Sequence, residues 1–444
     1  MTRASDAPGG GVTTFPSALR ALRHRNYRLF FAGQSVSLVG TWVTRVATSW
    51  MVWRLTHSAW MLGLVSFCGL IPTLMLGPGA GVLVDRWDRH RALVVTQALS
   101  LAQSAVLAYL AFTGRATVGH VLALQVLQGV VNAVDTPARQ AFVVEMVGDR
   151  ADLPNAIALN SSMFNGSRLV GPAVGGALLG AAGEGWCFTV DAVSYVAVIA
   201  SLLAMRLAPR EAAAAAAPRR AFVAELTEGL RYAAGSPPVR SALVLVSVLS
   251  LLGMPYTVLM PGIAAQALRG GPHTLGWLMT AAGAGALAAA GYLAQRRAVA
   301  GLGRVIVAGT FAFGGSLAVF AWAAEGARSL ALALGVLPVV GAGLLLATGS
   351  ANTVLQTILP DALRGRVMAL YTTAFLGTAP LGSLLAGALA ARVGAGRTIA
   401  LCGAGVLAAG VWFARALPGL RAGVRARLDA AAAAPATPPA PRGA

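Results

Sequence analysis

Long apolar runs separated by short polar segments dominate the pattern of the chain. Twelve runs have about 20 residues or more, the length that an α-helix needs to cross the hydrocarbon core of a bilayer. Most are apolar on every side, which fits lipid better than water as their surroundings. The pattern predicts membrane-spanning helices over 28–53, 59–83, 92–113, 119–144, 157–182, 186–205, 241–266, 274–294, 304–323, 329–356, 366–391 and 397–416.

The longest interruption between these runs is 206–240. Its second part has apolar positions at helical spacing, so we expect a helix that lies at the membrane surface. The Ala/Pro-rich end of the chain is typical of disorder. The pattern therefore divides the chain into a first helical half over 1–205, a central loop over 206–240, a second half over 241–416 and a disordered tail over 417–444.

An internal repeat supports the division into halves. Residues 169–183 (LVGPAVGGALLGAAG) align without gaps to residues 380–394 (PLGSLLAGALAARVG), so that Gly176 matches Gly387. Residues 81–86 resemble residues 291–296 at nearly the same offset. Two matches at nearly one offset predict duplicated six-helix halves. Transporters are commonly built from such repeats, with the substrate site between them.

The charge pattern predicts orientation. The net charge is +19, yet the arginines lie in short loops and do not cluster on one soluble module, so we expect no nucleic-acid partner. Only 11% of the residues are charged, compared with roughly 25% in soluble domains. With the N-terminus in the cytoplasm, our loop assignment places 25 arginines inside and 6 outside. This asymmetry predicts that both termini are cytoplasmic.

The candidate chemistry of an enzyme is missing from the pattern. The cysteines, Cys68, Cys187 and Cys402, fall inside apolar runs at spacings that suit neither a metal site nor a disulfide framework. The five histidines lie in loops or at the ends of runs, and no HExxH motif is present. We therefore expect no catalytic residues, no metal and no cofactor, although an intramembrane enzyme stays the rival from another class.

A charged motif follows the second apolar run. It reads Gly81-Val-Leu-Val-Asp85-Arg86-Trp-Asp88-Arg89-His90-Arg91. A glycine allows close helix approach, and the carboxylate and arginines can form charge pairs at helix ends. The motif resembles the signature loop of the major facilitator superfamily, with Asp88 in place of its second glycine. The resemblance implies a cytoplasmic loop that controls conformational switching; the alternative is a basic loop that only sets topology.

A second motif lies in the fifth run. Ser167, Gly171, Pro172, Gly175 and Gly176 resemble the antiporter motif of drug exporters in this superfamily, with Ser167 in place of the first glycine. Small residues at this spacing form a smooth face that admits another helix. The alternative is ordinary small-residue packing between helices.

Polar residues in the apolar runs mark a candidate substrate or coupling site. In the fourth run the spacing of 3 and 4 puts five of them on one helical face: Gln125, Gln128, Asn132, Asp135 and Arg139. Arg45, Asn165, Arg168 and Asn352 lie in other runs. Polar groups in spanning helices usually face a cavity or one another. Asp135 could carry a proton or form a permanent bridge with Arg139, and Arg45 could face Asp135 or attract an anionic group.

Three segments refine the resemblance. Residues 40–65, 134–147 and 153–176 are similar to the branch of the superfamily that holds the enterobactin exporter and macrolide efflux pumps. This implies a twelve-helix major facilitator fold in a bacterial inner membrane and a monomeric secondary transporter. It would export a siderophore, a macrolide or another drug-like small molecule, with protons as the coupling ion. Gln125 replaces an arginine of the family pattern, which weakens the inference about coupling. Uptake, or a lipid-like substrate, is the alternative.

Overall fold

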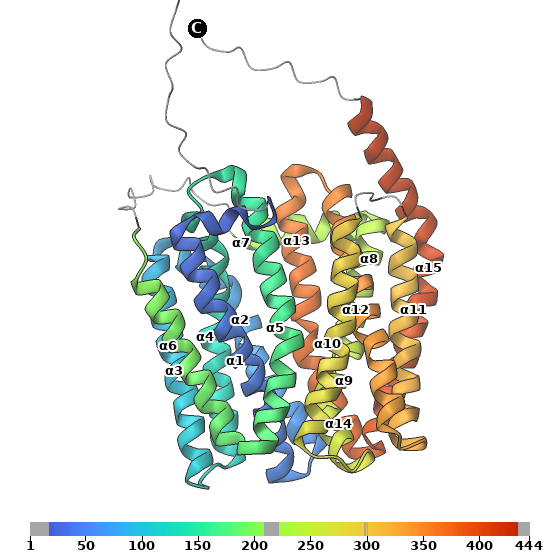
Figure 1. Ribbon diagram of the computed structural model, residues 1–444. Helices are drawn as coiled ribbons and strands as arrows, with labels where there is room; N and C mark the ends of the chain where they lie inside the picture. Colours follow the sequence, from blue (N-terminus) through green and yellow to red (C-terminus); the bar gives the residue numbers. More distant parts are fainter. Residues whose placement is uncertain (1–16, 208–221, 297–298, 300, 434–444) are drawn as a thin grey trace, which may run out of the picture.

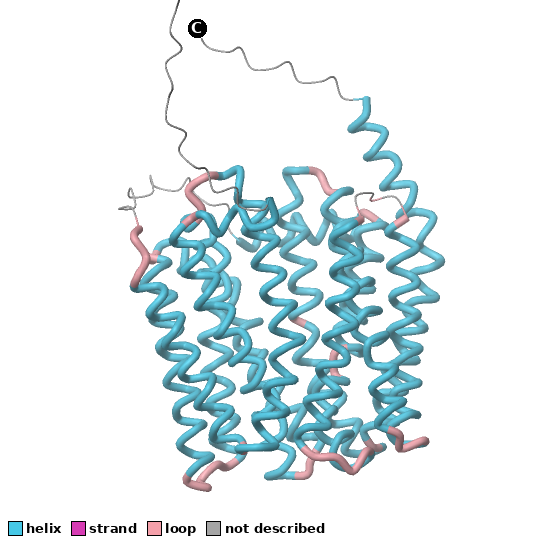
Figure 2. The backbone as a smooth tube through the Cα atoms, viewed as in Figure 1, coloured by secondary structure: helices cyan, strands magenta, loops and turns pink. Residues whose placement is uncertain are grey.

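The computed structural model describes residues 17–207, 222–296, 299 and 301–433, and within these ranges every regular element is a helix (Figures 1 and 2). The helices run nearly side by side along one direction. The chain enters and leaves at the same end of the bundle, which we call the terminal end (top of Figure 1); the opposite end is the far end. Apolar helices of this length satisfy their own backbone hydrogen bonds, as a bilayer requires.

The first part of the chain supplies six long helices. They are α1 (Arg25–Thr56), α2 (Ala59–Arg86), α3 (Arg89–Phe112), α4 (Val118–Met146), α5 (Leu153–Ala182) and α6 (Glu184–Leu203). Within this first bundle α1 packs on α5 and α6, α2 on α4, and α3 on α4 and α6. The chain then continues to α7 (Phe222–Gly235) at the terminal end.

The remaining helices form a second bundle. They are α8 (Pro237–Val248), α9 (Tyr256–Gly262), α10 (Pro272–Gln295), α11 (Leu302–Ala321), α12 (Leu330–Ile358), α13 (Asp361–Leu376), α14 (Thr378–Val393) and α15 (Ala395–Ala433). Several are parts of longer rods: a π-helical turn over Leu249–Gly253 follows α8, and α13 runs into α14. The two bundles meet mainly along two helix pairs, α2 with α14 and α5 with α10.

Ten helical stretches in the described ranges are long and apolar enough to cross a membrane. Neither α1 nor α5 is among them, although they have 32 and 30 residues. Their length suffices for a crossing, but both carry polar side chains along one side, including Arg45 and Arg168. Length and composition therefore support ten of the twelve expected spans, and the crossings by α1 and α5, which hold much of the candidate site, stay a prediction.

The structure corrects the predicted disordered tail and contains the helix predicted within 206–240. The prediction of a disordered tail from residue 417 is wrong in part, because α15 continues as a helix to Ala433. Its run of alanines has the highest intrinsic helix propensity, which outweighs the polar composition. The helix predicted within 206–240 is present as α7, and Glu228 on α7 forms an ion pair of 2.7 Å with Arg366 on α13. That pair ties α7 to the second bundle.

Candidate functional site

The two bundles touch most closely through glycines near the far end. A Cβ atom placed on Gly176 of α5 would lie 2.6 Å from the Cα of Gly276 on α10. A Cβ atom on Gly63 of α2 would lie 2.9 Å from the Cα of Gly387 on α14. Carbon atoms normally pack at about 3.5–4.0 Å, so each contact requires glycine. Such small residues are how membrane helices approach backbone to backbone.

The two glycine contacts are related by the internal repeat. Gly176 and Gly387 occupy matching positions of the repeated segments, one in each half of the sequence. Each packs on the other bundle's helix that begins at the far end: α10 for Gly176 and α2 for Gly387. The same contact is thus made twice, with the roles of the two bundles exchanged.

The bundles separate toward the terminal end. Gly77 on α2 and Gly291 on α10 lie about four helical turns from Gly63 and Gly276. Nothing lies within 4 Å of a Cβ atom placed on either of them. Met75 on α2 is 74% exposed. The interface is therefore closed at the far end and open at the terminal end.

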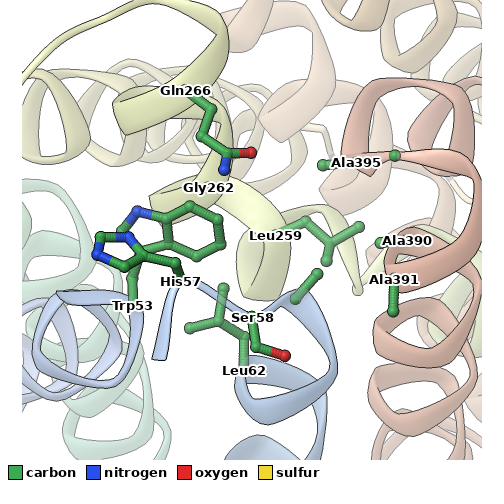
Figure 3. A pocket seen from close by; sticks show the side chains of 12 residues that line it. Trp53, His57, Ser58, Leu62, Leu259, Gly262, Gln266, Ala390, Ala391 and Ala395 are labelled. Carbon is green, nitrogen blue, oxygen red and sulfur yellow. The ribbon is translucent and has the colours of Figure 1, made fainter. Parts of the chain in front are cut away.

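A small pocket remains between the bundles at the far end (Figure 3). Its volume is about 260 Å³, and its walls include Trp53, Leu62, Leu259, Gly262 and Ala390. Trp53 stands edge-on to His57, with ring centroids 5.9 Å apart. Pockets that hold drug-sized ligands usually measure about 300–1,000 Å³. This pocket is smaller, and we assign it to the closed far end rather than to substrate binding.

The charged motif after α2 is an ordered helix junction at the terminal end. Asp88 caps α3 by accepting a hydrogen bond of 3.1 Å from the backbone N–H of Arg91. Arg89 donates to Glu145 of α4 at 2.7 Å. This pair joins the start of α3 to the end of α4 inside the first bundle. The surroundings of Gly81 and the side chains of Asp85 and Arg86 lie outside the described parts of the structure.

The antiporter-like segment of α5 is a packing surface on two sides. A Cβ atom on Gly171 would collide with Trp42 of α1, and one on Gly175 would lie 3.1 Å from the Cα of Val43. Gly176, on another side, meets α10. Pro172 and Ser167 are buried beside them. The segment therefore links α1 and α10 through one helix.

Asp135 belongs to a network between α3 and α4. Its carboxylate is 3% exposed and accepts hydrogen bonds from Thr96 at 2.9 Å and Gln97 at 2.7 Å, both on α3. It also forms an ion pair with Arg139, one turn further along α4. All of these partners lie within the first bundle. Of the two sequence alternatives for Arg45, pairing with Asp135 is not what the structure shows.

The other polar residues of α4 divide between two directions. Gln128 donates to Ser100 of α3 and to Asn132, each at 3.2 Å, and Asn132 is exposed. Gln125 lies against Gly69 of α2. Gln125 and Gln128, like Asp135, are thus polar packing between helices, whereas Asn132 is exposed.

Asn165 and Asn352 make local contacts. Asn165 donates to the carbonyl of Ser161 in its own helix at 2.9 Å. Asn352 accepts from Gln356 at 2.5 Å, one turn along α12. Among the described residues, neither forms a hydrogen bond to the other bundle. Only the positions of their helices therefore bring these two residues to the site.

Arg45 and Arg168 form a second charged group, across α1 and α5. Arg45 is exposed, with its guanidinium carbon 4.5 Å from the ring centre of Trp42. Arg168 is half-buried and interacts with the hydroxyl of Tyr256 on α9. Sequence reasoning missed Trp42 as a partner of Arg45. The signal for Trp42 was its position three residues before Arg45, on neighbouring faces of one helix.

Asp191 of α6 is a buried carboxylate that the polar stripes did not include. Its side chain is 1% exposed and accepts a hydrogen bond of 2.8 Å from Ser104 of α3. It lies beside Gly40, at the middle of α1. Asp191 is therefore a second buried carboxylate of the first bundle, beside Asp135.

A cluster at the terminal end fixes the segment just before α1 to the start of α5. Asp152 is 2% exposed and contacts His24 at 2.9 Å and Arg23 at 2.7 Å. The hydrogen bond from His24 lowers the pKa of the Asp152 carboxyl; burial opposes the effect, and the charges of Arg23 and Arg20 add to it. Asp152 therefore stays ionised and holds the basic segment before α1.

Residues 16–436 match the family described as "Transmembrane secretion effector". The chain is 29% identical over 388 residues to the multidrug efflux pump Tap of Mycolicibacterium fortuitum. The match covers 86% of this chain and 93% of that protein. The chain is 26% identical over 413 residues to the enterobactin exporter EntS of Shigella boydii serotype 18, covering 90% and 93%.

A solved structure shares the fold. A bacterial homologue of the human lysosomal transporter Spinster, in an inward-facing and occupied conformation, superposes with a TM-score of 0.66 at 15% identity. The match covers 91% of this chain and 98% of that one. At this identity the likeness concerns the arrangement of helices alone.

Proposed function

Because the chain belongs to the transmembrane secretion effector family of the major facilitator superfamily, and is thus a membrane transporter rather than an enzyme, we propose that it exports a small molecule by alternating access. The observation that supports this most strongly is the unequal contact between the bundles. They touch through glycines at one end and separate at the other. An interface that closes one end at a time is what alternating access requires.

The proposed topology includes α1 and α5 as spans, giving twelve in two pseudo-symmetric halves of six. The repeat-related glycine contacts and the arginine asymmetry support it. In this topology both termini are cytoplasmic, the membrane is the bacterial inner membrane, and α7 lies in the cytoplasmic loop. The terminal end then faces the cytoplasm, so the structure is open inward. A monomer suffices, since both bundles belong to one chain.

The proposed substrates are a siderophore, a macrolide or another drug-like compound. The multidrug efflux pump and the enterobactin exporter among the relatives support export of such molecules. Uptake of a nutrient, or movement of a lipid-like molecule, would use the same fold and is the second candidate. The direction of transport separates the two.

The proposed driving force is proton antiport. Two carboxylates lie deep inside the first bundle, Asp135 with Arg139 and Asp191 with Ser104. Carboxylates inside membrane helices commonly serve proton relays. Asp135 is the primary candidate, because Arg139 could exchange partners when the bundles move; Asp191 is the second.

The function is tested by comparing the metabolites of a deletion strain with those of its parent, inside and outside the cell. Export predicts a compound that accumulates inside the deletion strain and is missing from its medium. Inverted membrane vesicles that contain the protein should take up that compound, and a protonophore should abolish the uptake. Accumulation in the medium instead, or uptake by intact cells only, would contradict export.

A further inference from the structure

Arg45 points into the protein and yet is exposed to solvent. It follows Val36 by about two and a half turns of α1, so the two side chains leave opposite sides of the helix. Val36 is apolar and 55% exposed, as expected for a lipid-facing position. Arg45 therefore reaches solvent on the interior side of α1, between the bundles.

Arg168 has the same orientation on α5. Val170 follows it by two residues, which is roughly 200° around the helix, and is 47% exposed. Arg168 thus also faces the interior, where it interacts with the hydroxyl of Tyr256 from the second bundle. Arg45 lies over Trp42, and Trp42 packs at Gly171, about one turn of α5 beyond Arg168, so the two arginines belong to one region between α1 and α5.

Trp42 holds the Arg45 side chain in place. The guanidinium lies over the Trp42 ring at 4.5 Å from its centre, a cation–π contact. The base of Trp42 packs where a side chain at Gly171 would be. The position of Arg45 is therefore fixed by the same segment of α5 that carries Arg168.

Within the described residues, neither Arg45 nor Arg168 has a carboxylate partner. Asp135 is bonded to Arg139 and α3, and Asp191 to Ser104. No acidic residue occurs inside the predicted spans after residue 240. Two like charges held together at membrane depth are costly unless an anion joins them.

We propose that Arg45 and Arg168 together bind a carboxylate group of the transported molecule, so that the substrate is a small organic acid. This inference rests on the proposed transport function and specifies its substrate class. Planar guanidinium groups match the two oxygens of a carboxylate. Tyr256 brings the second bundle into contact with the same group, so the bound acid would touch both bundles.

The test uses purified protein in nanodiscs and three matched acid and amide pairs: benzoate and benzamide, salicylate and salicylamide, and 1-naphthylacetate and 1-naphthylacetamide. At least one acid should raise the Tm and bind about tenfold tighter than its amide, as expected when a charge-assisted contact is added. R45Q and R168Q should each abolish that preference. R54Q is the matched control, because Arg54 lies on the same helix but is paired with Glu184 at 2.7 Å.

A measurement on the unmodified protein covers variants that fail to fold. Phenylglyoxal should modify Arg45 and Arg168, and the preferred acid should protect both residues where its amide does not. Equal binding of all acids and amides, or a preference that survives in both R45Q and R168Q, would overturn the inference. Export of a neutral or cationic compound by the wild type would also overturn it while leaving the transport function intact. Absence of all transport would count against the function itself.

Discussion

Gly176→Ala should open the far end of the protein. The new Cβ atom would lie 2.6 Å from the Cα of Gly276, so the two helix backbones must separate by about 1 Å to reach normal contact. Overpacking of this kind costs roughly 1–3 kcal/mol. The cost falls on the state in which the far end is closed, because only there do the glycines touch. A cost of about 2 kcal/mol would raise the ratio of open to closed far ends about 30-fold.

Gly166→Ala is the matched control. Gly166 lies on the same helix, and nothing lies within 4 Å of a Cβ atom placed there. Both substitutions gain the same intrinsic helix propensity, roughly 1 kcal/mol, so this effect cancels in the comparison. Any difference between the two variants therefore reports the contact with α10.

The opening is measured by the alkylation rate of a cysteine at position 62, in a protein without the native cysteines. Leu62 is 4% exposed and lines the far-end pocket, so the thiol reacts only when the bundles separate there. Gly176→Ala should accelerate alkylation by up to about 30-fold, whereas Gly166→Ala should leave it unchanged. Rates within twofold of each other would refute the reasoning about the glycine contact.

Four further predictions concern the other clusters. The Asp152 pKa is lowered in the folded protein, so the ionised carboxylate stabilises the fold above the ordinary aspartate pKa of about 3.9, and this stabilisation is lost as pH falls through the lower folded pKa. Unfolding curves from pH 7 to 3 should therefore show that Asp152→Asn has a reduced Tm at neutral pH and a Tm that declines less in acid. Asp135→Asn should bind substrate and exchange it downhill but lose accumulation driven by a pH gradient; pumping at the parental rate would exclude Asp135 as the coupling residue. Glu145→Gln removes a partly exposed pair with Arg89, a loss of about 0.2–1 kcal/mol, and should lower turnover up to fivefold with unchanged substrate Kd. Gly171→Leu should displace Trp42 and abolish transport while the protein still reaches the membrane; normal transport would contradict the packing.

Most helices could be predicted from the sequence because apolar length alone decides whether a segment can cross lipid. The same rule placed the end of α15 too early, because apolar length takes no account of the helix propensity of an alanine run outside the membrane. The rule is met less clearly by α1 and α5, whose polar side chains keep them out of the ten stretches that are apolar enough to cross a membrane.

The candidate site was less predictable, because periodicity shows which residues share a face but not which neighbour covers that face. The stripe through Asp135 was correctly placed on one side of α4, yet part of that side packs on α3. Trp42 was missed because aromatic residues are ordinary in membrane helices. The contact of Gly63 with Gly387 joins positions more than 300 residues apart, and only the folded chain brings them together.

The depth of the contacts between the bundles also determines how motion is distributed along them. They begin at Gly176 and Gly276 and reach inward to Gly283 of α10, which meets the backbone of Arg168, and to Leu74 of α2, which meets Gly377. A rigid rotation about that inner limit would produce large displacements at the two membrane surfaces and small displacements near the axis of rotation. A ligand held by Arg168 would then keep nearly constant distances to its partners while its exposure changed sides. Its binding energy would vary little through the cycle, which leaves the direction of transport to the driving force.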